Sequence, residues 1–329
     1  MKELLTSRQI CLTATLAGVL MAGCAMAQQR WIGADEQGLV TDGRVQSFAL
    51  PPGSGPVTVA VAPDGVVWFT EGQGNRIGRI NPDGSGYRNF PLPHAGSAPR
   101  IIALGADGAM WFSEHEGNRI GRISAQGEIR EFDLPTPASQ PRAIALGADG
   151  NLWFVQFAAN RIGRITPEGV LTEFPLPTPD GGPRALAAGP DGNIWYSAFK
   201  AGLIGRITPR GEITEFRLPR PDSGPGDITA GADGAMWFVQ LSGTMDGVQV
   251  DGGRIGRITM DGRVTEYVMP TRTPSPINIA VGPDRNIWYT QGSWVGRVTP
   301  DGRISEFQLG EGSRGAGLSA GSDRRPPQR

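Results

Sequence analysis

Tryptophan recurs at a nearly fixed interval along most of this chain, and this repeat constrains the fold more than any other feature. Successive copies are separated by 43, 42, 42, 42 and 51 residues, at Trp68, Trp111, Trp153, Trp195, Trp237 and Trp288. The chain also holds 49 Gly and 28 Pro among 329 residues. Such a share is typical of disorder when it has no period, but here it follows the repeat and therefore indicates turns.

One copy of the repeat, residues 141–177, divides into four short segments. They cover 142–146, 151–156, 161–166 and 170–176, and each is rich in β-branched, aliphatic or aromatic residues. Asp149-Gly150 and Glu168-Gly169 stand between neighbouring segments, and Gly supplies the positive φ that a tight hairpin needs. Four antiparallel strands in ~42 residues are typical of one blade of a β-propeller.

The number of copies predicts how the ring closes. The aromatic residue of the fourth segment occurs seven times, as Phe48, Phe90, Phe132, Phe174, Phe216, Tyr267 and Phe307. A further second segment begins at Trp31, and residues 316–323 resemble the first segment at 226–233. We therefore expect an all-β, seven-bladed β-propeller of four-stranded antiparallel blades, whose last blade is closed by N- and C-terminal strands. This closure leaves no open sheet edge. Six blades with a loose flap remain the alternative.

The first 27 residues have the pattern of a signal peptide. Lys2 and Arg8 precede an apolar stretch at 10–21, and Ala25-Met26-Ala27 is a cleavage site of the small-x-small type. Cys24 offers a competing interpretation as a lipid-anchored residue. We expect residues 1–27 to be a signal peptide, 28–323 one propeller domain and 324–329 a disordered tail, with a periplasmic or secreted location. No later apolar run approaches the ~18 residues of a membrane span.

The charges nearly cancel, with 31 Lys and Arg against 32 Asp and Glu. Composition therefore gives no basic face for nucleic acid, and we expect a monomer that binds a small molecule or a cyclic peptide. Function on a repeat scaffold usually lies where the copies differ, on the loops of one face.

Two such positions differ between copies and are expected to meet at one end of the ring. The first follows the proline that opens the first segment, and three consecutive copies have Arg there: Arg100, Arg142 and Arg184. The other copies have Val57, Gly226, Ile277 and Ala316. The second lies at the end of the second segment and includes Glu114, His115, Gln156 and Phe157.

These residues predict a pocket for an anionic or carbonyl-rich ligand. Arg presents a planar fork that pairs with carboxylate or phosphate oxygens. We expect Arg100, Arg142 and Arg184, with Gln156 and Phe157, to bind the ligand. His115 would be a general base oriented by the Glu114 carboxylate. The alternatives are that the arginines pair with Glu71, Glu114 and backbone carbonyls around a watery channel, and that His115, like His94, is a solvated loop residue.

Other recurrent residues are expected to be structural. Each copy has an Arg in its third segment, and one carboxylate per hairpin turn cannot supply the six or more oxygens that calcium needs. The 51-residue interval contains nine extra residues between Trp237 and Ile255. This insertion is either a lid over the opening or a tolerated surface loop.

The repeat, in the form GNLWF…NRIGRITPEG…TEFPLPTP at 150–179, resembles the virginiamycin B lyase (streptogramin lyase) family across 31–323. The resemblance implies a magnesium-dependent lyase that opens a cyclic depsipeptide antibiotic at its ester by elimination, with a histidine base and a metal that polarises the carbonyl. The family's histidines follow the proline of the first segment, and none of the seven residues at that position here is histidine.

Two functions therefore stay open, a lyase with its base relocated to His115 and a non-catalytic binding propeller. A lactonase-type calcium propeller ranks last, because Asp227 and Asn278 are the nearest acidic or amide residues at the entries of the first segments.

Overall fold

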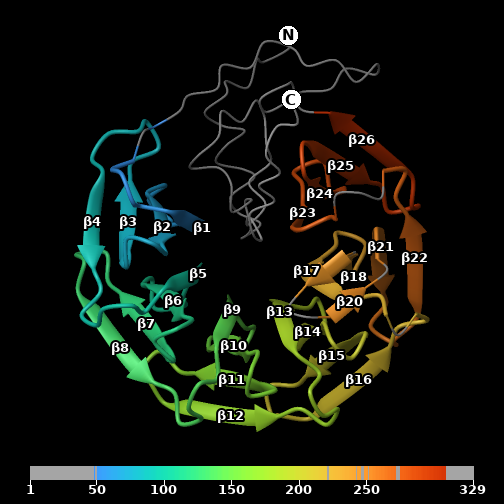
Figure 1. Cartoon of the computed structure of the whole chain (residues 1–329), viewed down its shortest axis with the longest axis horizontal. Helices are drawn as coiled ribbons and strands as arrows, with labels where there is room; N and C mark the ends of the chain where they lie inside the picture. The colour runs from blue at the N-terminus through green and yellow to red at the C-terminus, as the bar shows by residue number, and fades with distance from the viewer. Residues whose placement is uncertain are drawn as a thin grey trace, which may run out of the picture.

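The structure is a computed structural model and describes residue 48 and residues 50–308, except 221, 242, 246–247, 251 and 272–274. The described residues form six four-stranded antiparallel sheets, arranged as blades around a ring (Figure 1), and one two-stranded hairpin. No described segment forms a helix that could span a membrane.

The blades follow one another in sequence order. Blade 1 contains β1 (Pro56–Val61), β2 (Val67–Glu71), β3 (Arg76–Ile80) and β4 (Arg88–Pro91). Blade 2 contains β5 (Pro99–Leu104), β6 (Met110–Glu114), β7 (Arg119–Ile123) and β8 (Ile129–Asp133). Blade 3 contains β9 (Pro141–Leu146), β10 (Leu152–Gln156), β11 (Arg161–Ile165) and β12 (Leu171–Pro175). Blade 4 contains β13 (Pro183–Ala188), β14 (Ile194–Ala198), β15 (Leu203–Ile207) and β16 (Ile213–Arg217).

Blade 5 contains β17 (Pro225–Ala230), β18 (Met236–Gln240), β21 (Arg254–Ile258) and β22 (Val264–Val268). Blade 6 contains β23 (Ile279–Val281), β24 (Ile287–Gln291), β25 (Trp294–Val298) and β26 (Ile304–Gln308). In each blade the first strand is innermost and the last is outermost (Figure 1). Each blade therefore has two ends. The turn end carries the tight turns after the first and third strands, and the mouth end carries the loops after the second and fourth strands.

Apolar packing between neighbouring blades forms the core. One cluster joins Trp153 and Val155 of blade 3 to Ile194 and Tyr196 of blade 4. The glycine of each third strand lets the aromatic ring of the second strand lie flat. A Cβ on Gly121 would lie 2.1 Å from the Phe112 ring. The predicted blade, with its interlocking aromatic residues, is therefore confirmed.

A single contact bears on the predicted seventh blade. In blades 1 to 5 the aromatic residue of the outermost strand packs on the positive-φ glycine in a turn of the next blade. A Cβ on Gly127 of blade 2 would lie 2.1 Å from Phe90 of blade 1. Phe48 makes the same contact with Gly84 of blade 1, where the distance would be 1.6 Å. Phe48 thus takes the place of an outermost-strand residue in a blade that precedes blade 1. The other segments predicted for that blade, at Trp31 and at 316–323, lie outside the described residues, as do 1–27 and 324–329.

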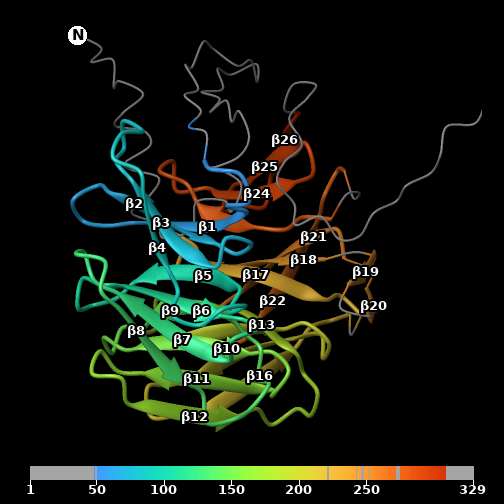
Figure 2. The ribbon, with the colours of Figure 1, turned by 60° about the vertical axis from the view of Figure 1, so that its left-hand side comes forward.

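The insertion in blade 5 forms a hairpin of β19 (Gly243–Met245) and β20 (Val248–Val250). The hairpin extends from the mouth end of blade 5, in the connection between β18 and β21. In both views it lies beside these two strands and away from the centre of the ring (Figures 1 and 2). The hairpin therefore does not cover the opening in this structure.

Candidate functional site

The first strands of blades 2, 3 and 4 are bulged at the mouth end, where their arginines lie. In blade 2, Pro99 pairs with Glu114 and Ile102 pairs with Phe112, so Arg100 and Ile101 oppose the single residue Ser113. The registers of β9 with β10 and of β13 with β14 also shift at Arg142 and Arg184. A bulge bends the strand and re-aims a side chain. Regular alternation along the strand therefore does not set the direction of these arginines.

Buried hydroxyl groups hold the bulges and tie neighbouring blades together. Ser113 Oγ accepts the amide of Ile101 at 3.2 Å and donates to the carbonyl of Arg142 in blade 3 at 2.6 Å. In the same way, Thr70 Oγ1 of blade 1 donates to the carbonyl of Arg100 at 2.7 Å. The backbones of Arg100 and Arg142 are thus fixed by the preceding blade. Sequence reasoning missed Ser113 and Thr70, although a hydroxyl two residues after the repeat tryptophan was a usable signal.

Two of the mouth arginines lie beside a phenyl ring from the end of the second strand in their own blade. The Arg142 guanidinium carbon lies 3.5 Å from the centre of the Phe157 ring, and that of Arg184 lies 5.2 Å from Phe199. The charge of Arg100 acts on the imidazole of His115, which holds the corresponding position in blade 2. The corresponding pairs of blades 1, 5 and 6 carry neither a charge nor a ring: Val57 with Gly72, Gly226 with Leu241, and Ile277 with Gly292. Charged and aromatic groups are therefore concentrated in one sector, which we call the arginine sector: Arg100, His115, Arg142, Phe157, Arg184 and Phe199.

The surroundings of His115 favour the neutral form of its imidazole. Its Nδ1 donates to the Pro141 carbonyl at 3.2 Å, because a carbonyl oxygen can only accept, and its side chain is 12% exposed. Burial lowers the pKa of His115 below its usual value, and the charges of Arg100 and Arg142 lower it further, against the opposing hydrogen bond to Pro141. In this tautomer Nε2 has the lone pair of a base, and Glu116 Oε1 lies 3.6 Å from it.

The structure does not bring Glu114 to His115. Glu114 is fully buried inside blade 2, where Arg119 Nε lies 3.4 Å from its Oε2. Gln156 is also fully buried, and its amide donates to Glu173 Oε1 at 2.6 Å within blade 3. These two predicted site residues therefore point into their blades. The Pro141 carbonyl takes the orienting role that we had expected of Glu114.

The structure also gives the positions of the other residues that were predicted for the site. Arg100, Arg142 and Arg184 are half-buried at the mouth end, and Phe157 also has the Lys200 ammonium 5.5 Å from its ring centre. Glu71, an expected partner of the mouth arginines, instead pairs with Arg76 of its own blade at 2.6 Å.

Asp227 is the only acidic residue on the described innermost strands. Its two oxygens accept the amides of Ile228 at 3.0 Å and Ile279 at 3.1 Å, so it bridges blades 5 and 6. Burial raises the pKa of Asp227 to about 6, while these two amides and the Arg184 charge act in the opposite direction. Asp227 thus adds a carboxyl group next to the arginine sector.

The implied magnesium ion does not fit the arginine sector. Among the described residues no group of three or more His, Cys, Asp or Glu side chains is placed to hold a metal ion. Magnesium prefers oxygen ligands, whereas this sector presents guanidinium groups, phenyl rings and one imidazole. We therefore assign the sector no chemistry that passes through a metal.

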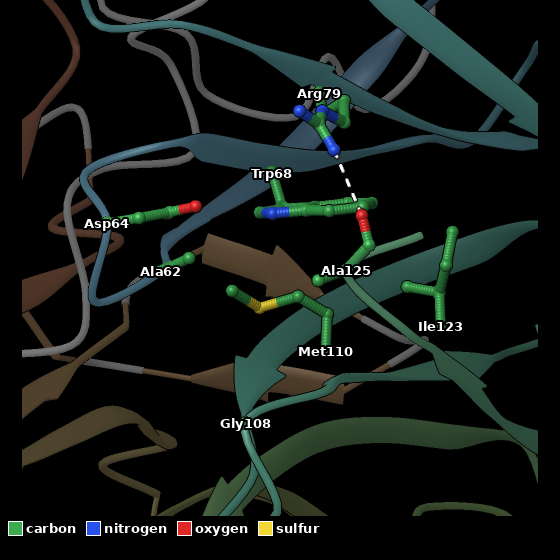
Figure 3. Close-up of a pocket in the computed structure, with 8 residues that line it drawn as sticks. All are labelled: Ala62, Asp64, Trp68, Arg79, Gly108, Met110, Ile123 and Ala125. Atoms are coloured by element: carbon green, nitrogen blue, oxygen red, sulfur yellow. Dashed lines mark hydrogen bonds between the residues drawn. The ribbon is translucent and has the colours of Figure 1, made fainter. Parts of the chain in front are cut away.

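A cleft at the turn end is too small to compete as a site. It has a volume of about 50 Å³ between blades 1 and 2 and is lined by Ala62, Asp64, Trp68, Arg79, Gly108, Met110, Ile123 and Ala125 (Figure 3). Arg79 crosses it to donate to the Ala125 carbonyl at 3.0 Å. This space suits ordered water rather than an organic ligand.

The virginiamycin B lyase family model matches residues 28–248 and 247–325 of this chain. The chain belongs to the virginiamycin B lyase family. It is 38% identical to a crystal structure of virginiamycin B lyase from Staphylococcus aureus, with a TM-score of 0.72 over 78% of this chain and 85% of that one.

A catalytically inactive histidine-to-alanine variant of the Staphylococcus aureus lyase, solved with quinupristin, is 37% identical to this chain. Its TM-score is 0.74 over 81% of this chain and 89% of that one. The match to virginiamycin B lyase of Bordetella bronchiseptica is 62% identical over 37 residues, which is 12% of that relative's length. The family fold is thus shared. The histidines that the family resemblance implies have no counterpart at the described first-strand entries.

Proposed function

We propose that this family member binds a small, carbonyl-rich or anionic ligand of the cyclic peptide or lactone class at the arginine sector, outside the cytoplasm. The observation that carries the proposal is that three consecutive blades, and no other described blade, have an arginine at the entry of the first strand, and that Arg142 and Arg184 lie against phenyl rings. Stacking on a ring fixes the plane of a guanidinium group, and its N–H fork then meets carboxylate or carbonyl oxygens with little loss of side-chain freedom.

The ligand class follows from the chemistry of the sector and from the relatives. Positive groups above phenyl rings suit a ligand with several carbonyl oxygens and an apolar surface between them. A cyclic depsipeptide has both features. A Staphylococcus aureus relative that was solved with quinupristin supports this class. The signal-peptide pattern of residues 1–27 supports a location outside the cytoplasm.

Calorimetric titration of the purified chain with quinupristin tests the proposal. We expect saturable binding that falls at least about tenfold in Arg142→Ala, because a charge-assisted contact is worth on the order of 1.5–3 kcal/mol. Arg303→Ala is the matched control, since Arg303 is 85% exposed at the turn end. Equal loss in both variants, or no binding by the native chain, would contradict the proposal for this ligand class.

A second function, ester opening by elimination, is favoured by the state of His115. The neutral Nε2 would take the proton from the carbon next to a ligand carbonyl. The C–H electron pair would then form a carbon–carbon double bond, and the C–O bond of the ester would break to release a carboxylate. Arg100 and Arg142, whose charges act on His115, would stabilise the negative charge that develops on oxygen.

A linearisation assay distinguishes elimination from binding alone. The product mass and chromatographic shift of quinupristin or virginiamycin B would be recorded with magnesium and with chelator, for the native chain and His115→Ala. We expect opening that survives chelation and disappears in His115→Ala. The rate should rise with pH and level off once the imidazole is fully deprotonated. This plateau should begin at a lower pH than for an ordinary histidine, because the pKa of His115 is lowered. Unaltered ligand at high protein concentration would leave binding as the function.

A further inference from the structure

The interior of blade 2 differs from blades 3 and 5 at a position where those blades have an amide donor. In blade 3 the Gln156 amide donates to Glu173 at 2.6 Å, and in blade 5 the Gln240 amide donates to Glu266 at 2.7 Å. Blade 2 has Glu114 at the position of these glutamines, and Glu131 at the position of Glu173. An ionised carboxylate only accepts hydrogen bonds. Glu114 can therefore replace the missing amide donor only when it carries a proton.

The surroundings of this pair favour one proton over two negative charges. The side chain of Glu114 is 0% exposed and that of Glu131 is 6% exposed. Both oxygens of Glu114 and Oε1 of Glu131 are buried, and within the described part of the chain they accept no hydrogen bond. Arg119 is the single guanidinium beside them, with Nε 3.4 Å from Glu114 and 3.7 Å from Glu131. Two buried carboxylates beside one guanidinium leave a negative charge that burial makes costly.

We propose that Glu114 and Glu131 share one proton, carried by Glu114 near neutral pH, and that this proton makes blade 2 a pH-sensitive element beside His115. A protonated Glu114 gives Glu131 the same kind of bond that Gln156 gives Glu173. The shift of the Glu114 pKa agrees with this geometry. Burial raises the pKa of Glu114 to about 7, Glu131 raises it as well, and Ser97 and Arg119 oppose the rise.

The groups around the pair come from every neighbouring segment. His94 contacts Glu131 through Nδ1 from the loop that enters blade 2, and Asp133 lies 3.6 Å from Arg119 at the end of β8. Ser97, from the same entering loop, is fully buried. The proton therefore sits among one guanidinium, one imidazole and three carboxyl groups.

The entering loop connects this pair to His115. The amides of Glu116 and Gly117 both donate to the Ser97 carbonyl at 3.2 Å, and the His115 amide donates to the Ala98 carbonyl at 3.2 Å. Loss of the proton would place a second negative charge behind this loop. We therefore expect the order of the His115 loop to decrease as Glu114 ionises. The consequence for ligand binding rests on the proposed function, whereas the shared proton does not.

The sign of the stability effect follows from the raised pKa. Below the usual pKa of glutamate, near 4.5, Glu114 is protonated in both the folded and the unfolded chain. Between that pH and about 7 the unfolded chain loses the proton while the folded chain keeps it. Stability contributed by this group is thus fully present at low pH and is lost as pH rises through this window.

Thermal unfolding from pH 5 to 8 tests the shared proton independently of any ligand. Glu114→Gln supplies a permanent donor, so we expect it to unfold several degrees above the native chain at pH 8 and close to it at pH 5. Gln156→Glu is the reciprocal variant, because it builds the same pair in blade 3. It should lower the unfolding temperature at pH 8 more than at pH 5.

An infrared difference spectrum between acidic and neutral pH gives a second measurement. The carbonyl band of a protonated buried carboxyl group should be present in the native chain and absent in Glu114→Gln. Parallel pH profiles for the native chain and Glu114→Gln would overturn the proposal. So would stabilisation by magnesium at pH 8 that the native chain shows and Glu114→Gln lacks, because a metal ion would then occupy the place of the proton.

Discussion

The two ends of the blades are built from the same repeat but differ in how faithfully they repeat it. At the turn end the tryptophan indole donates to the turn aspartate at 3.0–3.1 Å in blades 2 to 6, as in Trp153 with Asp149. At the mouth end only three of the six described blades have an arginine at the entry of the first strand, and in two of them it lies against an aromatic ring. Contacts that every blade needs cannot be altered for one ligand, whereas positions that differ between blades are available for recognition.

The strongest contrast should come from removing one repeated tryptophan. Trp153 is fully buried and stacks on Phe174 with ring centres 5.6 Å apart. We expect Trp153→Ala to lower the free energy of unfolding by about 3–5 kcal/mol, because it opens a cavity between blades 3 and 4. Denaturant titration measures this loss. Arg142→Ala should cost about 1 kcal/mol or less on the same scale. Similar losses of unfolding free energy in the two variants would contradict the difference between the turn end and the mouth end.

A residue that links the ends of two neighbouring blades should affect both stability and binding. Ser113→Ala removes the hydroxyl that holds the bulge at Ile101 and the carbonyl of Arg142. We expect a loss of about 1–3 kcal/mol in unfolding free energy, since a buried amide loses its partner. Quinupristin affinity should also decrease. Ser85→Ala, in the exposed turn of blade 1, is the control. Unchanged affinity in a folded Ser113→Ala would show that the bulge does not place the arginines for binding.

The smallest expected effect compares two turn aspartates. Asp107 accepts from the Trp111 indole at 3.1 Å and pairs with Arg122 at 2.7 Å, whereas Asp64 accepts a hydrogen bond from the Val66 amide in its own turn. Asp107→Ala should therefore destabilise the fold by about 1 kcal/mol more than Asp64→Ala. Thermal unfolding of the two variants measures the difference. An equal effect would mean that the turn, and not the contact with tryptophan, is what these aspartates stabilise.

Most of the blade could be predicted from the sequence because turns and strands alternate with a fixed period. The segment predicted at 151–156 is β10 (Leu152–Gln156), and Gly150 and Gly169 have positive φ values of 77° and 97° in the turns. The inserted residues, predicted as a loop, form a hairpin. The copies of the seventh blade at 31–43 and 316–323 remain a prediction.

The candidate site could be predicted only in part. Comparing copies identified Arg100, Arg142, Arg184, His115 and Phe157, because they break the repeat. It could not give the direction of Glu114 or Gln156. Every residue of β6 and β10 is buried, so the second strands show no alternation between an inner and an outer face. The bulges that re-aim the arginines also leave no mark in the sequence pattern.

The location of the binding site is best measured by hydrogen exchange of the native chain with and without quinupristin at saturation. The account predicts added protection of backbone amides at residues 97–101, 115–117 and 140–144, all at the mouth end of blades 2 and 3. Amides of the turn end, such as 147–150, should exchange at unchanged rates. Protection confined to the turn end, or to blades 5 and 6, would contradict the assignment of function to the arginine sector.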